Sequence, residues 1–498
     1  MPPDTKSKNI LLISGDVVNQ NMGGVGVRNW EVAHALARHC RVTLAVPGES
    51  DLRSQTVSLV PYDLQKSDLR PNAEGADVIV LHGPILHFHP YLREMGLPLA
   101  VDLYVPNLLE NLVWHDQDDW DQWIPAYEEY LRLQLDLLRA GDFFFCASER
   151  QRDYWLGWLH AQKRINPHTY RQDPTLRKLI DVIPFGLPTE PLAVTQHVLK
   201  GVHPGIGEGD YVLLWSGGLW DWLDPLTLIR AVGQLAPRYP ALKLYFMGTH
   251  HPNPLVTGMS MPERAIQLSQ ELGLFEKTVF FGDWVRYEER GNYLADADLA
   301  VVSHPGHIET RFSFRTRVLD CIWAGLPIVT TEGDAMADWV KQENLGLTVP
   351  PGDVDAMAQG IETIMLQPGG RVAYVDAFKK LQTTLQWSNV VRPLVEFCSA
   401  PEKAPDKGLY RTEAERVEQA KEAFLAQVVN EKDEFLARVV REKDGFLEQV
   451  IREKDAHFEQ AIQAKDNRIL EQDALIEYYR NLFPLRAYRG LKRLVGKK

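Results

Sequence analysis

The stretch NILLISGDVVNQNMGGVGVRNWEVAHALARHCRVTLAV, residues 9–46, decides the fold class. It opens with an apolar run, NILLIS, of the kind found in strands that are buried on both faces of a parallel sheet. A glycine-rich loop follows, and Val32, Ala33 and Leu36 then recur at helical spacing. A second apolar run, RVTLAV, completes a strand, loop, helix and strand. This unit predicts the start of a doubly wound α/β domain.

The alternation of apolar runs and helical patterns continues along the chain and then restarts after a polar linker at 196–208. Further strands are expected at DVIVL, PLAVDLY, FFFCAS and IDVIPF before the linker, and at YVLLWSGG, LKLYFMG, TVFFG, DLAVVSH and LPIVTT after it. We therefore predict two doubly wound, Rossmann-like domains, at 1–195 and 209–398, with the final helix of the second returning to the body. A second linker is expected at 399–410.

Composition restricts the class of protein. A chain of 498 residues is too long for one hydrophobic core, and its net charge of −13 argues against nucleic acid as a partner. The first residues, MPPDTKSKN, lack the apolar core of an export signal, and no run is long enough to span a membrane. The four cysteines are scattered without a CxxC pair, so neither disulfides nor a bound metal are expected. These features predict a cytoplasmic protein that needs no cofactor.

Residues 411–480 differ from the rest, because four copies of an 11-residue unit follow one another from Lys421. The copies are KEAFLAQVVNE, KDEFLARVVRE, KDGFLEQVIRE and KDAHFEQAIQA. A period of about 3.67 residues per turn keeps an apolar stripe nearly straight along a helix. We expect a long helix that forms a coiled coil with another copy of the chain or with a partner protein. A helix that lies on a membrane, with Lys432 and Lys443 reaching lipid phosphates, is the alternative.

The end of the chain, 481–498, is basic and amphipathic. Its sequence, NLFPLRAYRGLKRLVGKK, contains lysines and arginines interleaved with apolar residues and no acidic residue. Such an end favours contact with an anionic membrane surface, which would place the protein at the inner face of the membrane. A solvated terminus is the alternative.

Two glycine turns follow predicted strands, at positions where a parallel sheet binds ligands. Gly23, Gly24 and Gly26 precede the first helix, and Gly217 and Gly218 follow the run YVLLW. Glycine lets the backbone approach a ligand closely, and the first amides of the following helix can bind an anion. The first turn lacks the full dinucleotide-binding fingerprint, so a purely structural turn is the alternative there.

A loop rich in charged residues follows the run DLAVVSH. It contains His304 and Glu309, and the segment SFRTRVLDCIWAG then predicts a helix that starts near Ser313. Arg315 and Arg317 fall in the first turn of that helix, where a positive side chain opposes the helix dipole. A bound anion would offset both effects, and a diphosphate fits because arginine can hold two oxygens at once.

Asp320 lies one helical turn further on and could accept hydrogen bonds from a ribose diol. The alternative for this segment is a surface cluster in which Arg311, Arg315 and Arg317 pair with Glu309 and Asp320. The position of the loop at the ligand edge of a parallel sheet favours the anion site.

Two motifs resemble those of the family 4 glycosyltransferases, which have the GT-B fold. They are MGGVGVRNWEVAHALA at 22–37 and the acidic Asp320 just before AGLP at 324–327. The resemblance covers residues 9–398 and excludes the repeats. It implies that the second domain binds a nucleotide-diphosphate sugar, that no metal is needed and that the anomeric configuration is retained.

The resemblance also assigns roles to individual residues. In that family a glutamate, seven residues and a second glutamate precede the AGxP turn, and the second glutamate contacts the donor ribose. The second position is Asp320 here, whereas the first falls on Phe312, with Glu309 as the nearest replacement. The family has an arginine and a lysine after the GG turn, and here Arg315 and Arg317 would take their place.

In the first domain, Asp102 lies near the place where the family has a catalytic histidine. We expect it to position the acceptor or to stabilise positive charge on the sugar ring. The predicted function is transfer of a sugar from a nucleotide-diphosphate donor to a glycan or lipid-linked acceptor in surface polysaccharide synthesis. A sugar-nucleotide epimerase with the same fold, and a non-catalytic scaffold built on the repeat helix, are the alternatives.

Overall fold

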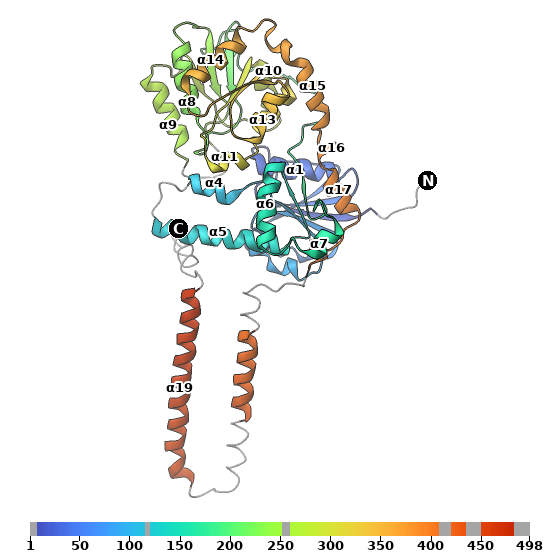
Figure 1. The fold of residues 1–498 in the computed structure, drawn as a ribbon, viewed down its shortest axis with the longest axis vertical. Coiled ribbons are helices and arrows are strands. Elements are labelled where there is room, and N and C mark those ends of the chain that lie inside the picture. Colours follow the sequence, from blue (N-terminus) through green and yellow to red (C-terminus); the bar gives the residue numbers. More distant parts are fainter. Residues whose placement is uncertain (1–6, 115–119, 251–258, 408–419, 435–449, 483–498) are drawn as a thin grey trace, which may run out of the picture. The chain divides into compact units, whose positions relative to one another are not determined.

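The computed structural model describes residues 7–114, 120–250, 259–407, 420–434 and 450–482. The chain forms two compact units. The first unit contains both α/β sheets, and the second contains the C-terminal repeats (Figure 1).

The first domain is built on a sheet of seven strands in which every neighbouring pair is parallel. The strand order is β3-β2-β1-β4-β5-β6-β7, so the order reverses between β1 and β4. The strands are β1 (Asn9–Ile13), β2 (Arg41–Pro47), β3 (Val57–Tyr62), β4 (Val78–His82), β5 (Leu99–Asp102), β6 (Phe143–Cys146) and β7 (Ile180–Val182). The sequence patterns do not predict β3, because it contains Pro61 and, as an edge strand, is only partly buried.

The second domain has a parallel sheet of six strands in the order β10-β9-β8-β11-β12-β13. The strands are β8 (Tyr211–Trp215), β9 (Leu242–Phe246), β10 (Val279–Phe281), β11 (Leu299–Val302), β12 (Ile328–Thr331) and β13 (Gly346–Val349). The sequence patterns do not predict β13 either, because GLTV is a short edge strand that begins with glycine. The predicted pair of Rossmann-like sheets is confirmed.

Helices connect the strands of both sheets, as parallel pairing requires. Up to residue 195 they are α1 (Gly24–Leu36), α2 (Arg70–Glu74), α3 (Ile85–Phe88), η1 (Pro90–Arg93), α4 (Asn107–Trp114), α5 (Trp120–Ala140), α6 (Glu149–Ala161) and α7 (Pro167–Gln172). In the second domain they are α8 (Pro225–Leu235), α9 (Met261–Glu271), α10 (Arg290–Asp296), α11 (Ile308–Phe312), α12 (Arg317–Ala324), α13 (Ala335–Gln342), α14 (Val354–Met365), η2 (Gly370–Tyr374) and α15 (Val375–Thr384).

Strand β1 is apolar throughout because both of its faces are covered. Ile10 and Leu12 belong to one buried hydrophobic cluster, whereas Leu11 and Ile13 belong to another. Successive side chains of a strand point to opposite faces of the sheet, so the two clusters lie on its two sides. This arrangement explains the continuous apolar run NILLIS with which the fold begins.

The chain crosses between the two domains twice, and the two crossing segments are bound to each other. Leu187 donates its N–H to the carbonyl of Leu385 at 2.7 Å, and Trp387 donates its N–H to the carbonyl of Leu187 at 3.1 Å. The first segment leads into the second domain and the other leads back out of it.

The last helices before the repeats are α16 (Trp387–Val390) and α17 (Arg392–Ser399). The ring of Phe397 in α17 stacks on Phe143 of β6, with centroids 5.0 Å apart. Further on, Ala404 donates its N–H to the buried carboxylate of Asp142 at 3.0 Å. The segment up to residue 404 is therefore bound to the first domain.

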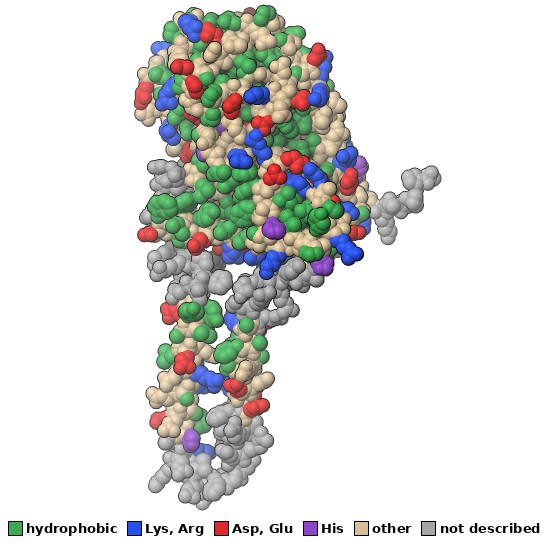
Figure 2. All heavy atoms as spheres, viewed as in Figure 1, with side chains coloured by type: hydrophobic (Ala, Val, Ile, Leu, Met, Phe, Trp, Pro, Cys, Tyr) green, Lys and Arg blue, Asp and Glu red, His purple; other side chains and the backbone are tan. Residues whose placement is uncertain are grey.

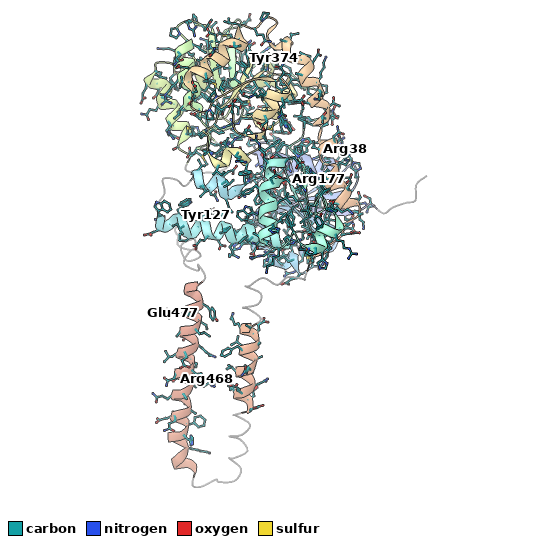
Figure 3. The ribbon with its side chains drawn as sticks, in the orientation of Figure 1. Arg38, Tyr127, Arg177, Tyr374, Arg468 and Glu477 are labelled. Atoms are coloured by element: carbon teal, nitrogen blue, oxygen red, sulfur yellow. The ribbon has the colours of Figure 1, made fainter. Side chains whose placement is uncertain are left out.

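The described repeat residues form two helices, at 420–434 and in α19 (Val450–Leu482). Arg468 of α19, labelled in Figure 3, donates to Glu431 at 3.2 Å, so the two helices lie side by side. A C-terminal helix is present, as predicted, whereas the bounds 411–480 stay a prediction.

Apolar side chains line both repeat helices and remain exposed (Figure 2). Examples are Phe424, which is 47% exposed, and Phe458, which is 66% exposed. The expected coiled coil stays a prediction, and the basic tail from residue 483 onward lies outside the described residues. Among the helices that the structure describes, none combines the length and the apolar character needed to cross a bilayer.

Two glycines of the first loop should differ in their tolerance of alanine. A Cβ on Gly26 would lie 2.3 Å from the carbonyl oxygen of Val17 and 2.8 Å from the Cβ of Met22, whereas the nearest atom to a Cβ on Gly24 is 3.8 Å away. We expect Gly26→Ala to reduce the free energy of unfolding by about 1–3 kcal/mol through overpacking. Gly24→Ala is the matched control and should keep the wild-type melting temperature. Equal melting temperatures for the two variants would contradict this packing.

Candidate functional site

The candidate site lies at the carboxyl edge of the second sheet, beside the point where the strand order reverses. The loop after β8 contains Gly217, whose φ of +96° favours glycine. The loop after β11 contains His304, whose side chain is fully buried. The first loop is joined to α12 where Arg317 donates from Nη2 to the carbonyl of Gly218 at 3.0 Å. Doubly wound sheets bind their ligands at such a place.

The arginine-rich segment is built differently from the prediction. Helix α11 ends at Phe312, the backbone of Ser313 is extended, and α12 begins only at Arg317. The expected helix start near Ser313 is therefore wrong. Arg315 lies in the connection before α12, and Arg311 is exposed on α11. A histidine side chain caps α11 and so starts a separate short helix, which the apolar periodicity of the sequence does not reveal.

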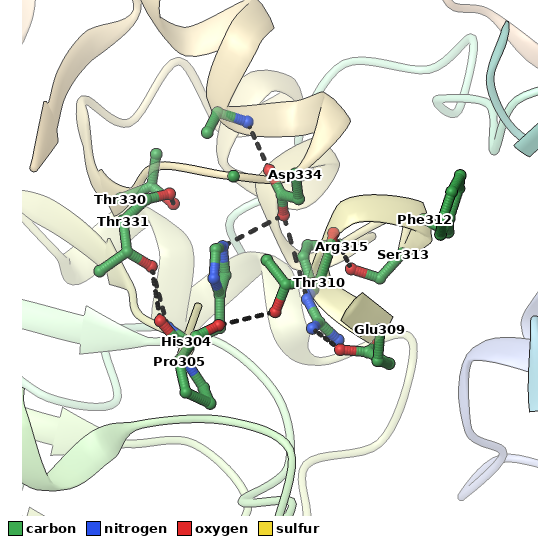
Figure 4. A network of polar contacts seen from close by, with 12 residues as sticks. His304, Pro305, Glu309, Thr310, Phe312, Ser313, Arg315, Thr330, Thr331 and Asp334 are labelled. Carbon is green, nitrogen blue, oxygen red and sulfur yellow. Dashed lines mark hydrogen bonds and ion pairs between the residues drawn. The ribbon is translucent and has the colours of Figure 1, made fainter. Parts of the chain in front are cut away.

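Arg315 is the centre of a buried polar cluster (Figure 4). It donates from Nη2 to Glu309 at 2.6 Å, and its Nε lies 3.9 Å from the carboxylate of Asp334. The same carboxylate lies 3.4 Å from the ring of His304 and accepts the N–H of Ala337 at 2.6 Å, which starts α13. The charge of Arg315 is thus balanced by two carboxylates inside the protein, and it is not the free cation that a diphosphate requires.

Arg317 has the environment of an anion-binding residue. It is half-buried in the first turn of α12, and its Nη1 is a buried donor without a hydrogen-bond partner among the described residues. Burial, and secondly the neighbouring charge of Arg315, lowers the pKa of its guanidinium to about 9. A buried cation with an unused donor is unfavourable unless an anion completes it. Among the described residues, Arg317 is therefore a candidate for binding an anion at this edge.

Asp320, the predicted ribose ligand, is also on α12 and accepts a hydrogen bond from Nε of Arg290 at 3.0 Å. The guanidinium of Arg290 lies 3.7 Å from the ring centroid of Tyr287 and 4.8 Å from that of Trp323. The side chain of Asp320 remains 31% exposed. It is therefore held in place by Arg290 and still accessible to a ligand.

The first domain has its own buried ion pair at the carboxyl edge of its sheet. Asp102, the last residue of β5, accepts from Nε of Arg28 at 2.6 Å and from the N–H of Tyr104 at 3.0 Å. Arg28 also donates to the carbonyl of Ile183 at 2.9 Å. His82 pairs with Asp102 in the sheet register, and burial lowers the pKa of its ring. Both oxygens of Asp102 are used within the protein.

The glycine loop of the first domain faces the second domain. A Cβ on Gly24 would lie 3.8 Å from the hydroxyl of Tyr104 and 4.0 Å from that of Thr316, and these two hydroxyls are hydrogen-bonded to each other. Gly23 precedes α1 as its N-cap, whereas Gly26 lies in the first turn of α1 and is packed against Val17 and Met22. Gly24 and the segment that leads to Arg317 are therefore neighbours across the two domains.

Comparison with known proteins finds a family model that matches the second domain. Residues 210–367 match the family model described as Glycosyl transferases group 1. The second domain is therefore similar to the glycosyltransferases of this group. The match covers the candidate site from the turn after β8 to the end of α14, and it confirms the family resemblance drawn from the sequence.

Individual relatives are more distant. A D-inositol 3-phosphate glycosyltransferase of Kribbella flavida is 27% identical over 192 residues, which are 39% of this chain and 44% of the relative. The chain thus spans less than half the length of that relative. A protein of the same description from Nocardiopsis dassonvillei is 23% identical over 65% of this chain and 72% of its own length.

Solved structures share the fold. Sucrose-phosphate synthase from Thermosynechococcus elongatus superposes with a TM-score of 0.56 at 16% identity, over 78% of this chain and 98% of its own. The Anabaena HepE protein, in complex with UDP and glucose, superposes with a TM-score of 0.55 at 15% identity, over 79% of this chain and 100% of its own. These similarities confirm the GT-B fold.

Several residues that surround the candidate site were not predicted from the sequence. They are Arg28, Glu110, Gln151, Arg290 and Asp334. Arg28 follows the glycine loop directly and could have been considered for that reason. The others approach from distant segments, so that only the folded chain shows their proximity.

Glu110 should make the stability of the protein depend on pH. Burial raises the pKa of this α4 carboxyl to about 8, and the nearby charge of Glu309 adds to the rise. A carboxyl whose pKa rises on folding stabilises the protein while it is protonated, and this stabilisation is lost as the pH rises from about 4.5 to about 8. We expect Glu110→Gln to melt at the wild-type temperature at pH 4.5 and several degrees above it at pH 9. The exposed control Glu74→Gln should follow the wild type at both values. A constant difference across this range would refute the role of Glu110.

Proposed function

We propose that the protein transfers a sugar from a nucleotide-diphosphate donor to a glycan or lipid-linked acceptor, in the synthesis of a surface polysaccharide. The second domain would bind the donor at the edge between β8 and β11. The first domain, with Asp102 and the loop of Gly23 and Gly24, would bind the acceptor. Retention of the anomeric configuration is part of the proposal and follows the resemblance to the family.

The environment of Arg317 carries this proposal. Its Nη1 is a buried donor without a partner in the described chain, next to Gly217 and Gly218 and at the first turn of α12. A diphosphate would receive hydrogen bonds from that guanidinium and from the first amides of the helix. Two structural neighbours support such a ligand, since one is in complex with UDP and glucose and another is bound with UDP-2-fluoro glucose.

The same residues supply a mechanism. Negative charge develops on the leaving diphosphate as the bond to the sugar breaks, and a fixed cation stabilises it most in the transition state. Arg317 would provide that cation, and Asp320, oriented by Arg290, would accept hydrogen bonds from the ribose. Glu309, held by Arg315, and His304 would define the wall of the site. Asp102, held in place by Arg28 and by the N–H of Tyr104, would act on the acceptor side.

The two arginines should separate binding from stability. In a thermal-shift series with UDP, GDP, ADP and TDP, we expect at least one nucleotide to stabilise the wild type. Arg317→Met should weaken that binding by about a hundredfold, as loss of a charge-assisted contact does, and should keep the wild-type melting temperature. Arg315→Met, the control, should instead lower the free energy of unfolding by about 3–5 kcal/mol, because it leaves buried carboxylates unpaired.

No binding by any nucleotide, or equal binding by Arg317→Met, would count against the proposal. Release of free nucleoside diphosphate only when acceptor is present would separate a transferase from an epimerase, and a scaffold would release none.

We further propose that the repeats connect the enzyme to another copy of itself or to a partner coiled coil, and that the basic tail contacts an anionic membrane surface. The exposed apolar residues of the two repeat helices support a partner. A chain that ends after residue 405 should keep its activity on a soluble acceptor, whereas its molar mass measured by light scattering should fall to that of a monomer. If the full-length chain already has the mass of a monomer, self-association through the repeats is excluded.

A further inference from the structure

Gln151 of α6 connects the two domains at the segment that leads to Arg317. Its side chain is completely buried. Nε2 donates to the carbonyl of Tyr104 in the first domain and to the carbonyl of Phe312 in the second, both at 2.9 Å. Oε1 accepts the N–H of Ala147 at 2.8 Å, which fixes the orientation of the amide. One side chain thus holds the backbones of both domains.

Neighbouring residues of α6 make contacts with the same part of the second domain. The ring of Tyr154 lies 4.9 Å from that of Phe312. Arg150 donates to the carbonyl of Gly333 at 2.8 Å and forms an ion pair with Asp338 of α13. These residues are adjacent on one face of α6, since positions three and four apart lie on the same side of a helix.

The contact is made where the chain departs from its family. The resemblance assigns the position of Phe312 to a glutamate of the donor site, and in this protein the residue binds the first domain instead. Phe312 is the last residue of α11, which also contains Glu309, and Arg317 follows five residues later. The position of α11 therefore determines where the connection that leads to Arg317 begins.

We propose that Gln151 is a positioning residue of the donor site. By holding the carbonyls of Tyr104 and Phe312 together, it fixes α11 and the connection to Arg317 when the two domains are in contact. A change in Gln151 should then weaken binding of a nucleoside diphosphate that Gln151 does not itself contact. This inference rests on the proposed function for its consequence in binding, but not for its consequence in the order of the loop.

The test compares Gln151→Met with Gln162→Met in the full-length protein. Methionine preserves the length and burial of the side chain but cannot donate to the two carbonyls. Gln162 ends the same helix and accepts a hydrogen bond from Arg139 at 2.9 Å, so its loss removes a contact within the first domain alone. Hydrogen exchange of the amides at 308–316 is measured without nucleotide, and the dissociation constant of UDP is then measured by calorimetry.

We expect Gln151→Met to raise the exchange rate at 308–316 and the dissociation constant of UDP, each on the order of ten-fold, because the hydrogen bonds to both carbonyls are lost. Gln162→Met should change neither. Unchanged exchange at 308–316 in Gln151→Met would overturn the inference. A second result would also overturn it, provided that the wild type binds UDP: faster exchange at 308–316 in Gln151→Met together with a wild-type dissociation constant for UDP. Gln151 would then have only a structural role.

Two further outcomes are informative. If Gln151→Met does not fold, Phe312→Ala replaces it, because that change removes the ring contact with Tyr154 and leaves Gln151 intact; the same increases are expected. If the wild type binds no UDP while exchange at 308–316 still rises in Gln151→Met, the positioning of the loop is supported and the proposed function is weakened. The two failures are therefore distinguishable.

Discussion

The buried ion pair between Arg315 and Glu309 is the constraint on which the candidate donor site depends. Two charges removed from water are unfavourable unless they meet at close range, and these atoms are 2.6 Å apart in a fully buried position. The pair holds the connection between α11 and α12 in one conformation, with Asp334 as a second carboxylate nearby. Because this connection is fixed, α12 begins at Arg317 with one guanidinium nitrogen still available for a ligand.

The first domain uses the same arrangement at its own sheet edge. Arg28 and Asp102 are as deeply buried as the pair in the second domain, and they too lie beside a glycine turn. In both domains, then, a rigid pair of opposite charges supports the loops at the carboxyl ends of the strands. Fixed charges of this kind need not reorganise when a substrate arrives, which is the condition for electrostatic stabilisation of a transition state.

Much of the fold could be predicted from the sequence, because buried parallel strands are apolar along their whole length. Strands β3 and β13 could not, since an edge strand is only partly covered and loses the continuous pattern. The sequence also pointed to the loop after β11 and to its arginines as a candidate site, and this assignment stays a prediction. Which arginine is free depends on partners such as Glu309 and Asp334, and the distances between them are set by tertiary packing alone.

The two segments that cross between the domains restrict how one domain can turn against the other. A single crossing strand could twist as well as bend, whereas two strands joined at Leu187 by hydrogen bonds resist torsion. We expect the remaining freedom to be rotation about one hinge axis. Since Ala404 is bound to Asp142, the segment that leads back out of the second domain ends fixed on the first domain, so a rotation of this kind would be absorbed in the short stretch around Leu187 and Leu385.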